Sequence, residues 1–508
     1  MNETIKKFIF LLAFIEGGAV MCVELCSAKI LSPYFGTSIY VWAAVLGITL
    51  TALMSGYYLG GYISSKNKKT SIIYWLMLIG GFLVTITPII SDIILPITIN
   101  LSLLTGTVIS LMFFLFVPLM LFGAVSPLII NLLTNNAKES GKSSGNVYAI
   151  STLGGIIITF TVGFYTLPQF GITYTLYGYG IMVMGISTFL FIKTKAFKPR
   201  VSIIFLIGIL SLNFQNRFET KEVIYQSEGI LGEVKVVDRT LYNHNEKIHK
   251  NYRELMVNNI SQTIMDKDFP EISYWNYVDV LMYNIKSYSN KGKKALLLGL
   301  GGGTLYTQLK KINMTIDVVE IDERIEQIAK KYFNINKDVN VVVDDARHYI
   351  NITQKKYDVV IYDLYHSETP PIHLMTKEAF GEIKNKLTKN GILVVNFYGF
   401  IKGSRGKAAR SIYKTLLDQK FDVRLMATAG TEESRNLLFI CSNEELKAKK
   451  NVIHTLLYEM DIDFDDAFIL TDDKPILEHI YLEAALNWRK NYNEINAKYF
   501  LKTNNSRN

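Results

Sequence analysis

The sequence predicts an α-helical multi-span membrane domain followed by an α/β domain with a doubly wound parallel sheet. Two observations predict this division. The chain of 508 residues is 49% hydrophobic and only 19% charged, with a mean hydropathy of +0.20, and its long apolar segments lie in the first 215 residues. After about Lys221, periodic strands are expected at Val223–Tyr225, Gly232–Val237 and Glu254–Asn258. After them, short buried strands alternate with helical stretches such as Thr304–Lys311 and Glu323–Tyr332, which is typical of βαβ units. Together they exclude a disordered tail, a fibrous repeat and a soluble enzyme of uniform composition.

The charge is unevenly distributed along the chain. Residues 1–200 hold 12 Lys and Arg against 5 Asp and Glu, whereas the remainder holds 42 against 40. The basic excess therefore belongs to the apolar half and indicates membrane topology, while the nearly neutral second half predicts no nucleic-acid partner. The three cysteines, Cys22, Cys26 and Cys441, provide neither a disulfide framework nor a Cys-rich metal site. No cluster of ligating residues has metal-site spacing, so no metal is expected.

Seven apolar segments are visible, near residues 8–31, 41–63, 72–95, 107–134, 147–167, 172–192 and 201–214. Six are long enough for a bilayer core, which takes about 20 helical residues. With the N-terminus inside, basic residues gather at the cytoplasmic ends, at Lys6, Lys7, Lys66, Lys68, Lys69, Lys138, Lys142, Lys193, Lys195, Lys198 and Arg200. Residues 96–106 and 168–171, on the opposite side, hold no Lys or Arg. We therefore expect a multi-pass protein of the cell membrane whose soluble domain faces the cytoplasm.

Two apolar segments need separate interpretation. The first is too long for a signal peptide, carries Glu16 and Glu24, and is followed at once by further spans. The seventh, Val201–Phe214, spans about 21 Å as a helix, short of a bilayer core of roughly 30 Å. We interpret it as a tilted, re-entrant or interfacial helix, because a full crossing would place the soluble domain outside.

Ionisable and small residues within the spans indicate internal contacts. Glu16, Glu24 and Lys29 form either a polar pocket or proton site, or an ion pair that holds helices together, with Lys29 also able to snorkel to the membrane edge. Gly56, Gly60 and Gly61 match a small-residue helix contact, for which packing is the favoured interpretation.

A glycine-rich loop is the sharpest local motif of the soluble half. Ala295–Thr304 reads Ala-Leu-Leu-Leu-Gly-Leu-Gly-Gly-Gly-Thr, a buried strand that runs into glycines and then into a helix. Glycines let the backbone approach a ligand without a Cβ clash. Glu320 ends the next strand about 20 residues later, where a carboxylate can accept both ribose hydroxyls. These features predict a Rossmann-like nucleoside site.

Two further strand ends carry carboxylates. One strand ends in Asp344-Asp345-Ala346 and the next in Tyr362-Asp363. Carboxylates at three successive strand ends are hard to explain by packing, because Asp and Glu are rarely buried without a partner. NAD and S-adenosylmethionine both fit such a site. Asp345 suits the adenine amino group and no second nucleotide-binding half follows, which favours S-adenosylmethionine or its decarboxylated form.

At these motifs the chain resembles a known family. Residues 222–445 resemble the catalytic domain of spermidine synthases, the polyamine aminopropyltransferases, in the small β segment, the glycine loop and the order of Glu320, Asp345 and Asp363. The segments Glu24–Gly36, Ile372–Glu378 and Leu470–Pro475 resemble the membrane-fused members. The apolar segments predict a membrane domain over 1–215. With the resemblance, the rest divides into a small β segment over 216–265, a Rossmann-like catalytic domain of the spermidine-synthase and S-adenosylmethionine-dependent methyltransferase type over 266–490, and a C-terminal tail over 491–508.

The resemblance also implies residue roles. The donor would contact Gly299, Gly301, Gly302, Gly303, Glu320, Asp344, Asp345, Ala346 and Gln262, with Glu320 on its ribose and Asp345 on its adenine. Asp363 would be the catalytic carboxylate, and Tyr274 would match the active-site tyrosine. Two positions depart from the family. Gly302 stands where soluble members carry an Asp that meets the donor's amine, and His366 stands where they carry an acidic residue that helps hold the diamine.

The departures bear on the substrates. Tyr365 and His366 can compensate for the lost carboxylates, or the substrates can differ, since a donor that keeps its own carboxylate tolerates Gly302 better than Asp. His366 is either a second proton acceptor, with a reference pKa of about 6.5, or a solvent-facing residue of a loop.

The favoured function is aminopropyl transfer from decarboxylated S-adenosylmethionine to an amine such as putrescine, which releases methylthioadenosine and needs no tightly bound cofactor. We expect a homodimer in the lipid bilayer. One alternative is S-adenosylmethionine-dependent transfer of a methyl or 3-amino-3-carboxypropyl group to a membrane-associated acceptor. A second is a non-catalytic transporter or sensor that binds a nucleoside. The joint presence of Asp363, Gln262 and Tyr274 favours catalysis.

Overall fold

The chain forms two compact units, which are described separately here. The computed structural model describes residues 3–134, 136–212, 222–243, 248–288, 293–365, 367–446, 456–457 and 463–505. The helical unit comprises Met1–Glu219 and Ser227–Glu233, and the α/β unit comprises Thr220–Gln226 and Val234–Asn508.

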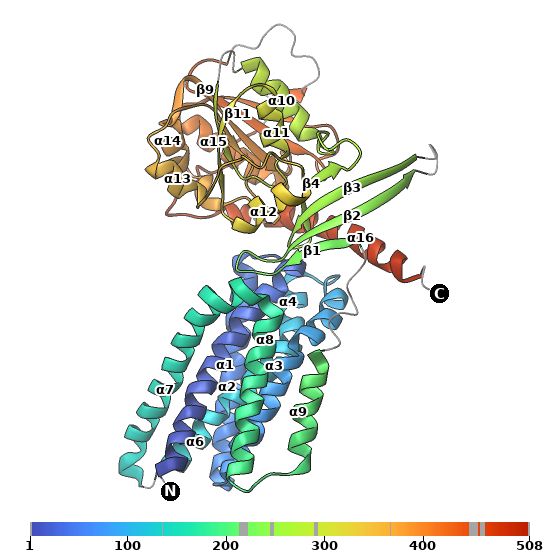
Figure 1. Ribbon diagram of the computed structural model, residues 1–508. Coiled ribbons are helices and arrows are strands. Elements are labelled where there is room, and N and C mark those ends of the chain that lie inside the picture. The colour runs from blue at the N-terminus through green and yellow to red at the C-terminus, as the bar shows by residue number, and fades with distance from the viewer. Residues whose placement is uncertain are drawn as a thin grey trace. The chain divides into compact units, whose positions relative to one another are not determined.

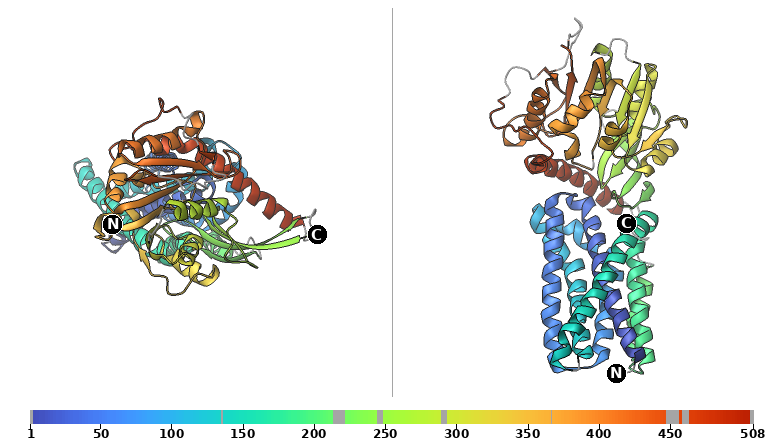
Figure 2. Two further views of the ribbon diagram at one scale, coloured as in Figure 1. Left: turned by 90° about the horizontal axis from the view of Figure 1, so that it is seen from above. Right: turned by 90° about the vertical axis from the view of Figure 1, so that its left-hand side faces the viewer.

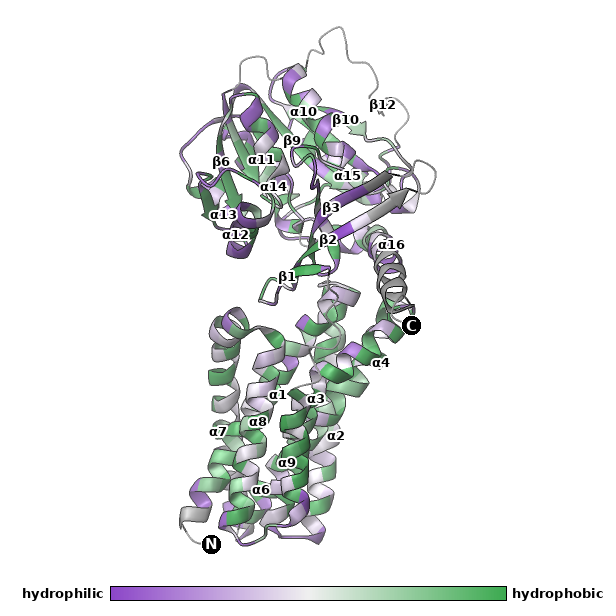
Figure 3. Cartoon of the chain, turned by 45° about the vertical axis from the view of Figure 1, so that its right-hand side comes forward, coloured by the Kyte–Doolittle hydropathy of each residue, from purple (hydrophilic) through white to green (hydrophobic). Residues whose placement is uncertain are grey.

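The helical unit is a bundle of long apolar helices (Figure 1). Its α-helices are α1 (Glu3–Phe35), α2 (Ile39–Lys66), α3 (Thr70–Thr98), α4 (Leu103–Leu111), α5 (Val117–Gly123), α6 (Val125–Leu133), α7 (Ser140–Thr161), α8 (Leu167–Lys193) and α9 (Pro199–Ser211). Single π-helical turns, η1 (Met112–Phe116) and η3 (Val162–Thr166), connect α4 to α5 and α7 to α8, and a 3₁₀ turn, η2 (Ala137–Glu139), precedes α7. Hydrophobic residues run along most of these helices (Figure 3).

Within the described residues, five helical stretches are long and apolar enough to cross a membrane: Lys6–Phe35, Ile39–Lys66, Thr70–Thr98, Leu103–Leu133 and Ser140–Lys193. The fifth contains the two segments that the sequence predicts over 147–167 and 172–192. It is broken at Gly171, whose φ of +76° is not helical, so that α7 and α8 are separate rods in Figure 1. The predicted segment at 201–214 forms the short helix α9.

Gly171 creates a helix N-terminus that a carboxylate caps. The two residues after it, Ile172 and Thr173, donate their backbone N–H groups to Oε2 of Glu228, over 2.7 and 3.1 Å. The first N–H groups of a helix have no partner within the helix, and a negative charge there is favourable. Glu228 thus fixes the segment Ser227–Glu233 within the helical unit.

Small residues let the helices approach closely, as the sequence predicts for Gly56 and Gly60. A Cβ atom on either glycine would overlap with backbone atoms of α5 or of Ala124, whereas the space beside Gly61 is open. A second contact of this kind joins α1 to α7. There a Cβ on Gly17 would overlap with the carbonyl of Ser151, and one on Gly154 with the carbonyl of Phe14.

The α1–α7 contact also surrounds a buried carboxylate. Oε2 of Glu16, on α1, accepts hydrogen bonds from the hydroxyl groups of Ser126 on α6, over 3.2 Å, and Ser151 on α7, over 3.0 Å. A buried carboxylate is costly without such donors. Glu16 therefore links three helices of the bundle.

We predict that Gly154→Ala destabilises the helical unit by about 1–3 kcal/mol, because the added methyl group has no room beside α1. Gly145→Ala is the matched control on the same helix, since nothing lies within 4 Å of a Cβ at that position. Thermal unfolding of the two variants in detergent measures the difference. Equal midpoints for both variants would contradict the close contact between α1 and α7.

The α/β unit begins with a four-stranded sheet in the order β1-β2-β3-β4. Its strands are β1 (Val223–Ser227), β2 (Val234–Asn243), β3 (Ile248–Val257) and β4 (Ile260–Asp266), and the pairs β2–β3 and β3–β4 are antiparallel. The sequence predicts the first three strands within this range, but not β4.

The second sheet has eight strands in the order β12-β10-β11-β9-β8-β5-β6-β7. They are β5 (Lys294–Leu298), β6 (Thr315–Glu320), β7 (Val341–Val343), β8 (Tyr357–Tyr362), β9 (Leu387–Tyr398), β10 (Asp422–Ala427), β11 (Asn436–Ser442) and β12 (Leu456–Leu457). From β7 to β9 the neighbouring strands are parallel. The prediction of a parallel sheet is wrong at β11, which runs antiparallel to β9 and β10. The connection from β10 to β11 is too short for the crossover that a parallel pair requires.

Helices cover both faces of this sheet (Figure 2). They are α10 (Asn276–Tyr288), α11 (Thr304–Lys311), α12 (Glu323–Tyr332), α13 (Ala346–Ile352), α14 (Lys377–Lys384), α15 (Lys407–Asp418) and α16 (Leu477–Asn505), with 3₁₀ turns η5 (Ile372–Leu374) and η6 (Ser404–Gly406). One hydrophobic cluster contains Leu281, Leu309 and Ile325 of α10–α12, and another contains Phe380, Ile412 and Tyr481 of α14–α16. The alternation of strands and helices expected from the sequence therefore forms a Rossmann-like fold.

Candidate functional site

The candidate site follows the carboxyl ends of five adjacent parallel strands. These ends lead into Asp344 after β7, Glu320 at the end of β6, Gly299 after β5, Asp363 after β8, and Asn396 near the end of β9. Backbone hydrogen bonds hold the turns in one row. The N–H groups of Gly299 and Asp363 donate to Val319 and Leu298, over 2.9 and 3.0 Å, and that of Asp344 donates to Glu320 over 3.1 Å. Ligands of such sheets bind at this edge.

The glycine loop requires glycine for two physical reasons. Gly299, Gly301 and Gly303 have φ angles of +89°, +51° and +79°, in the left-handed region that favours glycine. A Cβ atom on Gly299 would also overlap with the backbone carbonyl of Asp363. The loop thus brings bare backbone close to the backbone of Asp363, the residue that the sequence analysis expects to be catalytic.

Gly302 is enclosed by neighbouring side chains. Its N–H donates to Oγ1 of Thr263 over 2.8 Å. A Cβ at this position would lie 2.6 Å from Cγ2 of Thr263 and 2.9 Å from Cδ1 of Phe333. The position at which soluble spermidine synthases carry an Asp thus has no room here for a side chain unless Thr263 and Phe333 move.

Glu320, at the end of β6, bonds directly to the backbone of the glycine loop. Its Oε2 accepts the N–H of Leu300 over 2.9 Å, and its Oε1 accepts the N–H of Asp322 over 3.1 Å. Burial raises the pKa of Glu320, and the backbone donors oppose that shift. Each oxygen keeps a second lone pair, so the carboxylate can accept two ribose hydroxyls.

Asp344, Asp345 and Ala346 form the start of α13. Oδ1 of Asp345 caps the helix by accepting the N–H groups of Arg347 and His348, over 2.9 and 3.0 Å, while Ala346 is buried as its first residue. Burial by itself raises the pKa of Asp345, but the N–H of His348, the imidazole of His373 and the N–H of Arg347 hold it below its ordinary value. Asp345 is therefore an ionised acceptor at neutral pH.

Asp344 faces a different partner. Its Oδ1 accepts the N–H of Asp345 over 2.8 Å, and its Oδ2 lies 2.7 Å from Nδ1 of His348. His348 is one helical turn further along α13, and its side chain is 61% exposed. The two adjacent aspartates thus have separate histidine partners.

Asp363 is partly buried and held by two side chains. The hydroxyl of Tyr277 donates to its Oδ2 over 3.0 Å, and Nδ2 of Asn396 donates to its Oδ1 over 2.8 Å. Asn396 is oriented in turn by Asn436, which donates to its Oδ1 over 2.9 Å. Burial raises the pKa of Asp363, while Asn396 and Tyr277 oppose that shift. A carboxylate of raised pKa is a better proton acceptor than one in water.

The other predicted site residues have different neighbours. The hydroxyl of Tyr274, which precedes α10, donates to Oδ2 of Asp266 over 3.1 Å, whereas Tyr277, three residues later and within α10, contacts Asp363. Gln262 donates to the carbonyl of Ser367 over 3.3 Å. The hydroxyl of Tyr365 bonds to the backbone of Asn396 over 3.5 Å. His366 lies outside the described residues.

Helix α16 supports the loop after Asp363. Arg489 is buried, forms an ion pair with Glu368, and donates to Oγ of Ser367 over 2.9 Å. Ser367 has a φ of +66°, an uncommon conformation for a residue other than glycine. The ring of Trp488 lies edge-on to Tyr365, with centroids 5.4 Å apart. The loop is therefore fixed by a helix more than 100 residues away in sequence.

Sequence reasoning missed Tyr277 and Asn396. Asn396 had a signal, because it is a polar residue near the end of a buried strand, the same criterion that identified Asp363. Tyr277 had none beyond its place beside Tyr274 in an aromatic segment. Within the described ranges, no group of three or more His, Cys, Asp and Glu is placed to hold a metal ion.

Comparison with known proteins agrees with this geometry. The family described as "Spermine/spermidine synthase domain" matches residues 277–397, which run from Tyr277 to the end of β9 and include the glycine loop, Glu320, Asp345, Asp363 and Asn396. This region is therefore similar to spermine/spermidine synthase domains.

Polyamine aminopropyltransferases are homologous to this chain. The polyamine aminopropyltransferase of Vibrio vulnificus is 29% identical over 179 residues, which is 34% of this chain and 59% of that protein. The polyamine aminopropyltransferase 2 of Aquifex aeolicus is 24% identical over 406 residues, or 77% of this chain and 79% of that protein. The chain thus spans under two thirds of the Vibrio relative's length, but most of the Aquifex relative's.

A solved structure of a probable spermidine synthase from Corynebacterium glutamicum aligns with 46% of this chain and 83% of that chain. The sequence identity is 17% and the TM-score is 0.35.

Proposed function

We propose that this protein is a membrane-bound polyamine aminopropyltransferase. It transfers the aminopropyl group of decarboxylated S-adenosylmethionine to an amine such as putrescine and releases methylthioadenosine. The observation that carries the proposal is the partly buried carboxylate of Asp363, whose pKa is raised by burial. Asp363 follows a strand end beside the glycine loop and lies in the region that matches the spermine/spermidine synthase family. The polyamine aminopropyltransferases among its homologues support the same activity.

The reaction requires a neutral amine and a proton acceptor. The amine nitrogen forms a bond to the carbon beside the sulfonium, the carbon–sulfur bond breaks, and its electron pair stays on sulfur as a thioether. The amine is protonated at neutral pH, because alkylamines have pKa values near 10. Asp363 accepts the proton, directly or through water, while Tyr277 and Asn396 keep its carboxylate in place. Holding both reactants in line supplies most of the rate.

The remaining residues bind the donor and the acceptor. Glu320 holds the ribose, Asp345 with Asp344 and Ala346 forms the adenine end, and the glycines of the loop line the donor's tail. Gln262, on β4, and Tyr274 are assigned to the donor and the reaction centre, and Tyr365 and His366 are assigned to the acceptor amine. Because Gly302 brings no carboxylate, the preference between decarboxylated and intact donors is part of the test below.

The proposal includes the cell membrane as the site of the protein, as a multi-pass homodimer whose catalytic unit faces the cytoplasm. The five apolar stretches and the basic residues at one set of their ends support this orientation.

We predict that Asp363→Asn lowers kcat by about 100-fold or more, because an amide cannot accept the amine's proton. The full-length protein in detergent is incubated with putrescine and with decarboxylated or intact S-adenosylmethionine, and mass spectrometry identifies the nucleoside product. Asp358→Asn, at the other end of β8, is the matched control. Wild-type turnover by Asp363→Asn would refute its role, and S-adenosylhomocysteine as product would refute aminopropyl transfer.

We predict that Asn396→Ala changes how kcat/KM falls on the acid side of its pH profile. The N–H of Asn396 stabilises the ionised form of Asp363, so Asn396→Ala raises the pKa of that carboxyl further and leaves less of it ionised as the pH falls. The ratio of variant to wild-type kcat/KM should therefore decrease toward low pH, since the ionisation of the free amine is common to both. Tyr277→Phe should act in the same direction. A ratio independent of pH in both variants would exclude Asp363 as the titrating group.

Orientation is tested by cysteine labelling. Lys389 is exposed at the start of β9, whereas the native Cys22, Cys26 and Cys441 are buried. We predict that a membrane-impermeant maleimide labels the Lys389→Cys variant only after cells are permeabilised. The unsubstituted protein is the control. Labelling of intact cells would place the catalytic unit outside.

A further inference from the structure

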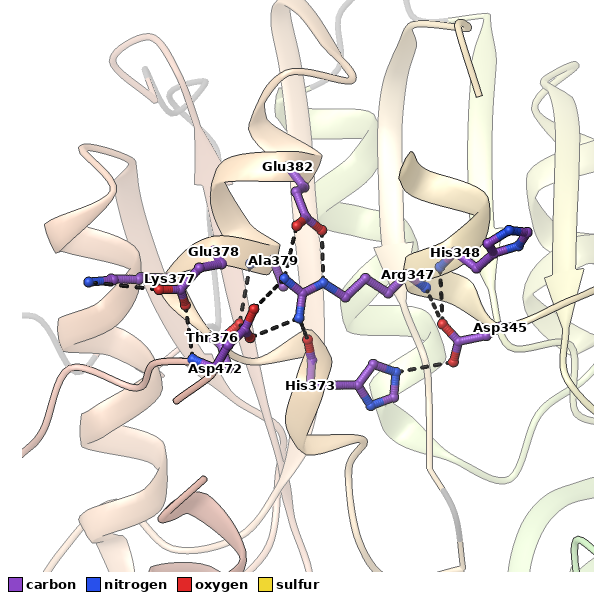
Figure 4. A network of polar contacts seen from close by, with 10 residues as sticks. All are labelled: Asp345, Arg347, His348, His373, Thr376, Lys377, Glu378, Ala379, Glu382 and Asp472. Carbon is purple, nitrogen blue, oxygen red and sulfur yellow. Dashed lines mark hydrogen bonds and ion pairs between the residues drawn. The ribbon is translucent and has the colours of Figure 1, made fainter. Parts of the chain in front are cut away.

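One histidine outside the predicted site touches the carboxylate proposed for adenine. Nε2 of His373, in the turn η5, lies 3.1 Å from Oδ2 of Asp345 (Figure 4). The other oxygen of Asp345 is engaged in capping α13. The side chains of His373 and Asp345 are 49% and 38% exposed, so a ligand can reach both. Oδ2 is therefore the oxygen open to a ligand, and His373 is its partner.

The position of His373 is fixed by an arginine that is fully engaged. Arg347 donates to the backbone carbonyl of His373 over 3.0 Å. It also forms paired hydrogen bonds with Glu382, over 2.8 and 2.9 Å, and with Asp472, over 2.7 and 2.8 Å. A guanidinium has five N–H donors, and these contacts use all of them. Arg347 thus has no donor left for a ligand and acts by holding the turn that carries His373.

The C-terminal part of the α/β unit completes this arrangement. Asp472 accepts the hydroxyl of Thr376 over 2.7 Å and donates its N–H to Glu378 over 3.1 Å. The N–H of Lys377 donates to the carbonyl of Leu470 over 2.8 Å. The segments Ile372–Glu378 and Leu470–Pro475, which the sequence analysis singles out and the proposed reaction leaves without a role, therefore meet at Arg347 (Figure 4).

The neighbouring histidine provides an internal comparison. His348 contacts Asp344 from the next turn of the same helix, a pairing that needs no support from other segments. His373 reaches Asp345 from a separate turn, 28 residues further along the chain. Arg347 bonds to the backbone of that turn, and Asp472 bonds to Thr376 just after it. Packing alone does not explain why the half-exposed imidazole of His373 lies against Oδ2 of Asp345, the oxygen that does not cap the helix.

We propose that His373 is a donor-binding residue that fixes Oδ2 of Asp345 as the acceptor for the 6-amino group of adenine. Arg347 and Asp472 are the positioning residues of His373. The inference rests on the proposed function, because it takes an adenosyl compound as the ligand. Oδ2 accepts the imidazole N–H on one lone pair and the adenine amino group on the other. A 6-oxo base places an acceptor against the same oxygen, so the arrangement selects adenine over hypoxanthine.

Binding of two reaction-product analogues tests the inference without turnover. Methylthioadenosine and methylthioinosine, which differ at position 6 of the base, are titrated calorimetrically into full-length protein in detergent. The wild type should prefer methylthioadenosine. His373→Ala should lose roughly tenfold in affinity for methylthioadenosine, as for a hydrogen bond to a charged group, and most of the preference. His373→Gln, which keeps an N–H donor, should retain more of both, and His348→Ala should match the wild type.

The positioning role has its own readout. Asp472→Asn should weaken methylthioadenosine binding in the same direction and leave the KM for the amine unchanged, whereas a purely structural defect would reduce the number of binding sites. Equal affinities of the wild type and His373→Ala for methylthioadenosine would overturn the inference and leave the proposed function standing. A wild type that does not bind methylthioadenosine would overturn the proposed function and this inference with it.

Discussion

A carboxylate taken out of water must find hydrogen-bond donors, and the candidate site depends on how Asp363 finds them. Burial alone raises its pKa, and each oxygen is compensated by one donor, Tyr277 or Asn396. These donors come from helix α10 and strand β9, so the carboxylate is held only when the sheet and its covering helix are assembled. The same burial that makes Asp363 costly for stability makes it basic enough to take a proton.

Two arginines that link distant segments stabilise the surroundings of the site. Arg347 joins α13 and α14 to Asp472, and Arg489 joins α16 to Glu368 in the loop after Asp363. Both guanidinium groups are largely buried and satisfied by carboxylates far away in the sequence. Removing one partner of such a pair leaves a charge without compensation. The C-terminal part of the chain is therefore part of the site, although it contributes no residue to the sheet edge.

The helical unit also contains a buried carboxylate that needs hydrogen-bond donors, and there serine hydroxyl groups provide them. Glu16 is buried among helices and satisfied by the hydroxyl groups of Ser126 and Ser151. Ser151 comes within reach because Gly17 and Gly154 let α1 and α7 approach until a methyl group would not fit between them. The partners that the structure gives Glu16 are these two serines, so the carboxylate links three helices through hydrogen bonds.

The sequence by itself determined the division into an apolar and an α/β half, because that division depends on local hydrophobic periodicity. It also determined the glycine loop and the carboxylates at the ends of β6, β7 and β8, because the carboxyl ends of parallel strands meet at one edge of a sheet. It also located Thr304–Lys311 and Glu323–Tyr332 as helices at the bounds that the structure gives them. It did not determine the antiparallel direction of β11, the pairing of Tyr277 rather than Tyr274 with Asp363, or the meeting of Arg347 with Asp472. Tertiary structure decided all three, because each depends on how elements pack and no local pattern encodes that packing. This holds for the direction of a strand, for the choice between two tyrosines three residues apart, and for an ion pair between residues more than 100 positions apart.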